Sequence, residues 1–315
     1  MQLDKGYCHT KQTAMISREQ WFHRLAHLHV YNAKHGTAPH KPLLLLVLLD
    51  LADEHALPEL LPLSPELAFR FAAYWSVVAH RRTQRPDVRF PFHHLQSDGF
   101  WVSLDASGQP SANRKLTTTG RLNPDFLQFL AVAENRVRAM QILVETYFPA
   151  DERLGLYALM GCEPPTDSDR QSAMDEIQRG EWRGRGRDAR FRLSVVAAYD
   201  YSCALTGLSI MTVEAASIVD AAHIHAFSDS RNDDPTNGLA LCKNAHWLFD
   251  QGIWTVADDY TARVAIGCFK EICPDQKALA SYHGQPLRLP RDERRWPNRE
   301  HLAWHRQRRF LGRGG

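Results

Sequence analysis

The sequence has no long hydrophobic run and few cysteines. The longest apolar stretch is Leu43–Leu49, whereas a membrane-spanning helix needs about 20 such residues. The chain does not open with a basic and then apolar leader, so we expect a cytoplasmic protein without membrane contact. Six cysteines among 315 residues are too sparse for a disulfide scaffold, and we expect them to be reduced.

A strong net charge is also absent, since the formal charge at pH 7 is +2. The arginines are nevertheless clustered. Residues 81–89 hold four arginines and one acidic residue, and residues 288–313 hold nine arginines and three acidic residues. Such clusters indicate contact with a polyanion at chosen places, although each one alone is equally consistent with a solvated surface. The 16 histidines direct attention to metal or proton-transfer chemistry.

Length and composition predict two globular domains. The helices and short extended pieces expected along the chain favour the α+β class. Residues 17–163 are expected to form a mainly α-helical domain with a small β element. A polar, basic linker is expected at 164–190, because Arg183-Gly184-Arg185-Gly186-Arg187 is typical of a flexible tether. Residues 191–315 form the second domain, and residues 1–16 are an N-terminal extension without an assigned role.

Helix-start signals organise the first domain. Ser17 and Gln20 make a capping box before one helix. Pro42 suits the first turn of a second helix, and Ser64-Pro65-Glu66 opens a third. Further helices are expected at about 123–132 and 137–148, with short extended pieces at 90–92 and 99–102.

The second domain carries an ordered set of motifs. A helix is expected at 191–199 and a strand at 218–224, ending in Ala222-His223-Ile224. Asn237-Gly238-Leu239 and then His246-Trp247-Leu248-Phe249-Asp250 follow. The set resembles the HNH nucleases of the ββα-metal class over about residues 187–256. This resemblance implies an endonuclease that hydrolyses DNA phosphodiesters with one divalent ion of the Mg, Mn, Co or Ni class.

Phosphodiester hydrolysis needs a nucleophile made from water and a positive charge that meets the charge developing on phosphate. The resemblance implies that His223 is the general base, because a neutral imidazole can accept a proton near pH 7. It further implies that His246 holds the metal ion and that the amide of Asn237 pins the neighbouring loop.

The second metal ligand stays open. Many relatives carry an acidic residue directly before the base histidine, where this chain has Ala222. Asp220, two residues earlier, or Asp250, one helical turn after His246, are the two candidates for the missing carboxylate.

A structural zinc is not expected. Many relatives hold zinc with two Cys-x-x-Cys pairs. Here Thr206 stands three residues after Cys203, and Ala245 stands three residues after Cys242, at the positions of the second cysteines. Each pair has therefore lost one cysteine. We expect both cysteines to be small buried apolar residues.

Two segments of the first domain, 38–45 and 89–101, contain His40-Lys41-Pro42 and Arg89-Phe90-Pro91-Phe92-His93-His94-Leu95. They resemble the sulfur-binding domain of McrA-like, phosphorothioate-dependent type IV restriction enzymes, over about residues 17–149. Sulfur is larger and a poorer hydrogen-bond acceptor than oxygen, so its reader should offer an apolar dimple.

The resemblance implies a role for each matching side chain. Phe90, Pro91 and His94 match the pocket, although relatives often carry Tyr and a small residue at the first and last of these positions. His40 and Lys41 match a grip on the modified phosphate. Further phosphate or base contacts are expected from Arg81, Arg82, Arg85, Arg89, Arg114 and Lys115. The alternative is that 90–92 is a core-facing edge strand and that the arginines are ordinary surface residues.

Three functions stay in play. The first is a phosphorothioate-dependent restriction endonuclease, dimeric so that both strands of double-stranded DNA are cut. The second is an HNH nuclease that reads a methylated base, although base readers usually need a flipped-base pocket and a β-rich domain. The third is a non-catalytic DNA-binding sensor.

Overall fold

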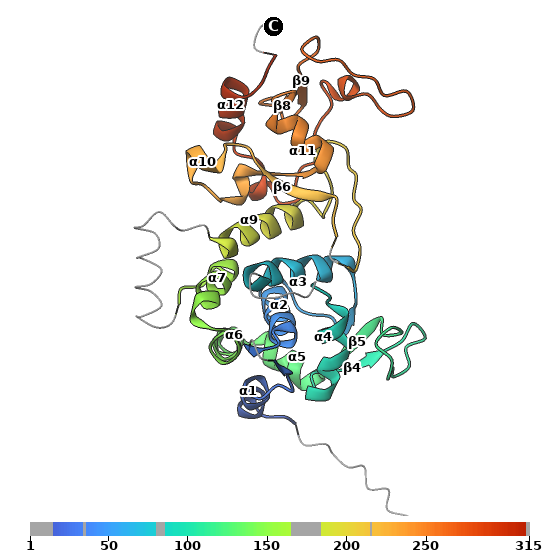
Figure 1. Cartoon of the computed structure of the whole chain (residues 1–315), viewed down its shortest axis with the longest axis vertical. Coiled ribbons are helices and arrows are strands. Elements are labelled where there is room, and N and C mark those ends of the chain that lie inside the picture. Colours follow the sequence, from blue (N-terminus) through green and yellow to red (C-terminus); the bar gives the residue numbers. More distant parts are fainter. Residues whose placement is uncertain (1–14, 34–35, 80–85, 165–183, 215, 313–315) are drawn as a thin grey trace, which may run out of the picture.

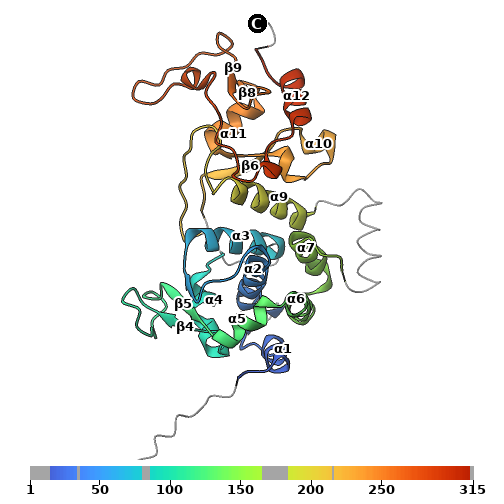
Figure 2. The ribbon, with the colours of Figure 1, turned by 180° about the vertical axis from the view of Figure 1, so that it is seen from behind.

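The computed structural model describes residues 15–33, 36–79, 86–164, 184–214 and 216–312. These residues form two hydrophobic cores, one from the N-terminal part of the chain and one mainly from the C-terminal part. The two parts are stacked along the long axis of the molecule (Figures 1 and 2). The mixture of helices and small antiparallel sheets agrees with the expected class. Within the described residues, every helix is too short or too polar to cross a bilayer.

Helices dominate the N-terminal part. They are α1 (Arg18–Ala26), α2 (His40–Glu54), α3 (Pro65–Val78), α4 (Arg89–His94), α5 (Pro124–Ala131), α6 (Ala133–Tyr147) and α7 (Ala150–Met160). The strands are β1 (Asn32–Ala33), β2 (Gly36–Thr37), β3 (Leu60–Pro62), β4 (Trp101–Leu104) and β5 (Thr119–Leu122). β5 lies between β3 and β4 in an antiparallel sheet, and β1 pairs with β2.

The predicted helix starts are confirmed. Ser17 and Gln20 form the capping box of α1. The Ser64 hydroxyl accepts the backbone N–H of Leu67 at the start of α3. In α2 the apolar run at 43–49 is buried all round, with at most 2% of any of its residues exposed, because other helices of this core surround it. Helix α7 carried no sequence signal that we recognised.

The extended piece expected at Phe90–Phe92 is wrong, because these residues belong to α4. A residue before proline favours extended backbone, but Pro91 lies in the first turn of α4, where its missing N–H costs nothing. Burial of Phe92 against Trp101, with ring centroids 4.9 Å apart, favours the helix over that local preference. The turn places Phe90 on the surface, 43% exposed.

The C-terminal part is built around one long helix and several short elements. The helices are α9 (Arg185–Ala198), α10 (Phe227–Ser230), α11 (Lys243–Asp250) and α12 (Arg299–Arg308). The strands are β6 (Val219–His223), β7 (Gly238–Cys242), β8 (Trp254–Val256) and β9 (Ala262–Val264). β6 pairs with β7 and β8 with β9, both antiparallel.

Helix α9 begins at Arg185, inside the segment 164–190 that was expected to be a linker. Residues 165–183 of that segment lie outside the described residues. The helix starts early because Gly186 and Ala189 are buried where α9 packs on α7. A Cβ built on Gly186 would lie 1.8 Å from the carbonyl oxygen of Gly155. The absence of a side chain at Gly186 therefore allows the backbones of α7 and α9 to touch.

Helix α3 makes the second connection between the two cores. Its Phe69 belongs to the C-terminal core and meets the Tyr201 ring edge-on, 5.6 Å between centroids. The guanidinium of Arg192 lies 4.7 Å over the same Phe69 ring. Farther along, Val213 packs on the N-terminal core and Glu214 pairs with Arg89 at 3.0 Å. The two parts therefore share side chains at several places.

We predict that Gly186→Ala lowers the free energy of unfolding by about 1–3 kcal/mol, the usual cost of overpacking a tight contact. The matched control is Arg185→Ala, an exposed position on the same helix, which should stay within about 0.5 kcal/mol of wild type. Urea unfolding measures both. Equal stability of the two variants would contradict the glycine contact between α7 and α9.

Candidate functional site

Strands β6 and β7 and helix α11 form a continuous ββα unit. The register runs from Val219 opposite Cys242 to His223 opposite Gly238, and β7 passes directly into α11. Gly238 is required where α9 crosses the start of β7, since a Cβ there would lie 2.4 Å from a methyl group of Val195. The order of elements that the motifs predicted for this part is present.

His223 lies at the end of β6 with its ring fixed on two sides. The ring stacks on Phe191 of α9, with centroids 3.8 Å apart and planes at 8°. Its Nε2 lies 2.9 Å from Oδ1 of Asp233. The side chain keeps 25% of its surface exposed. An imidazole that is held in place and still open to solvent has the properties that a general base needs.

Asn237 ties the loop before β7 to the end of β6. It is fully buried, and its Oδ1 accepts the backbone N–H of His225 at 2.9 Å. Its Nδ2 donates to the carbonyl oxygens of His225 and Asn232, at 3.0 and 2.9 Å. These three bonds satisfy the whole amide and fix the backbone just beyond His223.

His246 and Asp250 lie one turn apart on α11, with Nε2 3.5 Å from Oδ2. Burial raises the pKa of the Asp250 carboxyl, and the charges of His246, Arg309 and His223 act in the opposite direction. Asp250 therefore lies within electrostatic reach of both histidines. An imidazole and a carboxylate are donors that suit a divalent transition ion or magnesium.

The structure does not bring Asp220 to this pair. Its Oδ1 accepts a 2.6 Å hydrogen bond from Nε of Arg192. Asp220 is three residues before His223 on the same strand, so the two side chains point to opposite faces. Among the described residues no three His, Cys, Asp or Glu side chains are grouped to hold a metal. Of the residues expected to hold a metal, His246 and Asp250 are the two that lie together, and a hexacoordinate ion held by them would need water and phosphate oxygens to complete its shell.

Cys203 and Cys242 are buried. The hydroxyl of Thr206 lies 3.8 Å from Sγ of Cys242, and the backbone N–H of Thr206 donates to Sγ of Cys203 at 3.5 Å. The two cysteines and Thr206 thus pack as one small cluster beside β7.

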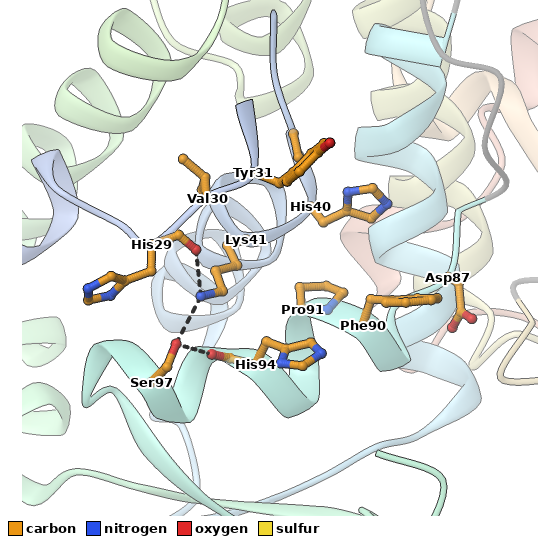
Figure 3. Close-up of a pocket in the computed structure, with 11 residues that line it drawn as sticks. His29, Val30, Tyr31, His40, Lys41, Asp87, Phe90, Pro91, His94 and Ser97 are labelled. Carbon is orange, nitrogen blue, oxygen red and sulfur yellow. Dashed lines mark hydrogen bonds between the residues drawn. The ribbon is translucent and has the colours of Figure 1, made fainter. Parts of the chain in front are cut away.

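A second candidate site is a pocket of about 780 Å³ in the N-terminal part. Helix α4 contributes Phe90, Pro91 and His94, and the start of α2 contributes His40 and Lys41 (Figure 3). The structure thus brings together, from segments about 50 residues apart, the five side chains that the resemblance to sulfur-binding domains selects.

Rings form one wall of the pocket. The guanidinium of Arg114 lies 3.6 Å from the centroid of the Phe90 ring, and the His40 ring lies 6.3 Å from Phe90 and 4.7 Å from Trp75. Pro91 is buried. Burial, aided by the charges of Lys41 and Arg114, lowers the pKa of His94, which favours its neutral form. This wall is therefore mostly aromatic, and the one carboxylate that also lines the pocket, Asp87, is paired with Arg89.

Lys41 differs from expectation because its ammonium group is already engaged. Nζ donates to the carbonyl of His29 at 2.8 Å and to the Ser97 hydroxyl at 3.0 Å (Figure 3). It also pairs with Asp98 at 2.6 Å. Burial opposes ionisation of Asp98, but hydrogen bonds from His29 and Lys41 outweigh it and lower the pKa of this carboxyl. Lys41 therefore braces the pocket and does not present a free charge.

The remaining predicted contacts separate into three groups. Arg89 pairs with Asp87 at 2.8 Å and with Glu214 at 3.0 Å, so its charge is compensated. Lys115 is exposed and is not among the residues that line the pocket. Three arginines lie outside the described residues: Arg81, Arg82 and Arg85.

Sequence reasoning missed several residues that the fold places at the two sites. The pocket is also lined by His29, Val30 and Tyr31, the last 76% exposed, from the segment after α1. No pattern in that segment singles them out. Phe191 and Asp233 contact His223 from a helix and from a polar loop. The loop contains neighbouring acidic residues, and spacing alone does not tell which one reaches the histidine.

Comparison with known proteins assigns the ββα unit. Residues 203–257 match the HNH endonuclease family, so the chain contains an HNH endonuclease domain. No curated protein matches the chain. Among solved structures, a modification dependent TagI restriction endonuclease aligns with 21% identity and a TM-score of 0.29. The alignment covers 38% of this chain and 37% of that one, and so low a likeness carries no argument here.

We predict that Asn237→Ala lowers the free energy of unfolding by about 1–3 kcal/mol, because it leaves buried backbone groups of the loop without partners. Asn244→Ala, at an exposed position on α11, is the control and should have little effect. Thermal and urea unfolding test the pair. A neutral Asn237→Ala would contradict the role of this amide in holding the loop.

Proposed function

We propose that the chain is a type IV restriction endonuclease that binds phosphorothioate-modified double-stranded DNA and hydrolyses nearby phosphodiester bonds. In this proposal residues 17–163 are the sulfur-binding reader, 164–190 connect the two parts, and 191–315 are the nuclease. The observation that carries the cutting function is the ββα unit matched to the HNH family, with His223, Asn237 and His246 in the motif positions.

The chemistry of cutting follows from these residues. His223 takes a proton from water, so that hydroxide attacks the phosphorus atom. Asn237 keeps the end of β6 and its loop in one conformation, which preserves the direction of the base. His246 and Asp250 would hold one divalent ion of the Mg, Mn, Co or Ni class, which when bound stabilises charge on the phosphate and on the leaving oxygen.

The reading function rests on the pocket between α2 and α4. A phosphorothioate sulfur hydrates more weakly than oxygen, so Phe90, Pro91 and the neutral His94 offer it an apolar contact at low cost. A normal phosphate would lose its water there without compensation, which gives selectivity. In this proposal His40, at the same wall, and Arg114, which stacks on Phe90, contact the oxygens of the same or the next phosphate.

Further parts of the proposal follow from the reaction. Cutting both strands of a duplex with one site per chain favours a homodimer, and the natural place of such a protein is the cytoplasm, where foreign DNA arrives. The described part of the N-terminal region is mainly helical, whereas readers of methylated bases usually use a β-rich domain with a flipped-base pocket, which disfavours the methyl-reading alternative. A non-catalytic sensor would not need His223, Asn237 and His246 together in the motif positions, which disfavours the sensor alternative.

We predict that His223→Ala lowers the single-turnover rate of DNA cleavage by about 10²–10⁴-fold, the range of general-base catalysis. DNA binding, measured by gel shift, should stay within about twofold of wild type. His55→Ala, an exposed histidine at the end of α2, is the control and should cleave normally. Cleavage by His223→Ala at the wild-type rate would show that another group is the base.

We predict that Pro91→Glu weakens binding to a duplex with one phosphorothioate by at least about tenfold, equivalent to about 1.4 kcal/mol. The new carboxylate would repel the phosphates of the DNA backbone and would replace the apolar surface that contacts sulfur. Binding to the unmodified duplex should change much less. The control is Pro58→Glu, the same substitution at an exposed proline away from the pocket lining. Equal loss on both duplexes would argue against a sulfur pocket.

A further inference from the structure

Asp233 is a buried carboxylate that contacts the candidate base. It lies in the loop between α10 and β7, and its side chain is 11% exposed. One oxygen, Oδ1, lies 2.9 Å from Nε2 of His223. The other, Oδ2, lies 2.9 Å from Nε of Arg187. The carboxylate therefore lies between an arginine of α9 and the histidine at the end of β6.

This contact decides which nitrogen of His223 carries the proton. An ionised carboxylate only accepts hydrogen bonds, so Nε2 must donate and must carry the hydrogen. In the neutral ring Nδ1 is then the nitrogen with the lone pair. A general base acts through that lone pair, so the contact selects Nδ1 as the atom that receives a proton from water.

The surroundings keep both partners in place. The stack on Phe191, at 8° between planes, holds the plane of the imidazole, and the contact with Asp233 selects which ring edge faces the carboxylate. Arg187 compensates the charge of Asp233, and its own guanidinium lies 4.4 Å over the Phe227 ring. An ionised, partnered carboxylate can also stabilise the imidazolium that forms when His223 is protonated.

We propose that Asp233 is a positioning residue for cleavage, which holds His223 in the tautomer with hydrogen on Nε2. The inference rests on the proposed nuclease function. In the step concerned, an O–H bond of water breaks and an N–H bond forms at Nδ1. The resulting hydroxide attacks phosphorus, and the bond from phosphorus to the leaving sugar oxygen breaks, that oxygen then taking a proton from solvent. Asp233 stays ionised throughout.

The first test compares Asp233→Asn with Asp229→Asn. The amide of Asp233→Asn can accept from one tautomer of His223 or donate to the other, so the preference is lost at nearly constant shape. We expect the cleavage rate to fall by about 10–100-fold, as for other groups that orient a functional histidine. Asp229 lies on the preceding short helix α10, where its carboxylate accepts an exposed hydrogen bond from the neighbouring Ser228 hydroxyl, and its variant should cleave normally.

A second variant guards against simple misfolding. Asp233→Glu keeps the negative charge and the accepting oxygens on a side chain one methylene longer. It should cleave faster than Asp233→Asn, whereas a purely structural role would favour the isosteric amide. The reverse order of rates would overturn the proposal.

The decisive readout is the proton position on His223. Nitrogen-15 labelling of the histidines in the full chain, with the His223 signals identified by their absence in His223→Gln, reports the tautomer directly at pH 8. We expect hydrogen on Nε2 in the wild type and loss of this preference in Asp233→Asn. Hydrogen on Nδ1 in the wild type, or an unchanged tautomer in a slow Asp233→Asn variant, would overturn the positioning role.

The outcomes separate this inference from the proposed function. Wild-type cleavage that depends on His223 but is insensitive to Asp233→Asn overturns the inference alone. A wild-type chain that cleaves no duplex at any divalent metal removes the nuclease function, and the positioning role falls with it.

Discussion

The flat stack of Phe191 on His223 is the contact on which the rest of the structure depends. Phe191 belongs to α9, which also crosses the start of β7 at Gly238 and touches α7 at Gly186. One helix thereby fixes the direction of the candidate base and joins the two hydrophobic cores. If α9 shifted, the imidazole, the ββα unit and the N-terminal part would all lose a partner.

Side-chain contacts also connect the pocket in the N-terminal part with the C-terminal part that contains the HNH domain. Trp75 of α3 contacts His40 in the pocket wall. Phe69, six residues earlier on the same helix, is packed in the C-terminal core and lies under Arg192. Arg89 on α4 reaches Glu214 in the C-terminal part. Side chains on two helices therefore contact both the pocket and the HNH domain, so the two sites do not belong to separate bodies.

Local signals in the sequence were reliable where one interaction decides the conformation. The capping residues Ser17 and Ser64 and the ordered ββα motifs predicted helices and strands at the correct places, because caps and apolar alternation act over a few residues. Phe90–Phe92 was mispredicted because burial of Phe92 against Trp101 outweighs the preference of the residue before proline. The early start of α9 depends on contact with Gly155, which no local pattern reveals.

The sequence predicts which residues belong to the candidate sites, but it does not predict most of the contacts that these residues make. The motifs selected His223, Asn237 and His246, and the pocket collected Phe90, Pro91, His94, His40 and Lys41 from two distant segments. The sequence does not show which oppositely charged residues pair with one another in the fold. Asp220 pairs with Arg192 on the face of β6 opposite to His223, and Lys41 forms an ion pair with Asp98. Asp233 reaches His223 only because the loop folds back over the strand.

In the proposed function, one chain both reads sulfur in the DNA backbone and cuts the DNA. The most direct measurement is cleavage of two duplexes that are identical except for one phosphorothioate, by the full chain with a divalent metal, with the break positions mapped on sequencing gels. We expect breaks close to the modified linkage and none in the plain duplex. Equal cleavage of both duplexes, or of neither, would contradict the proposed function.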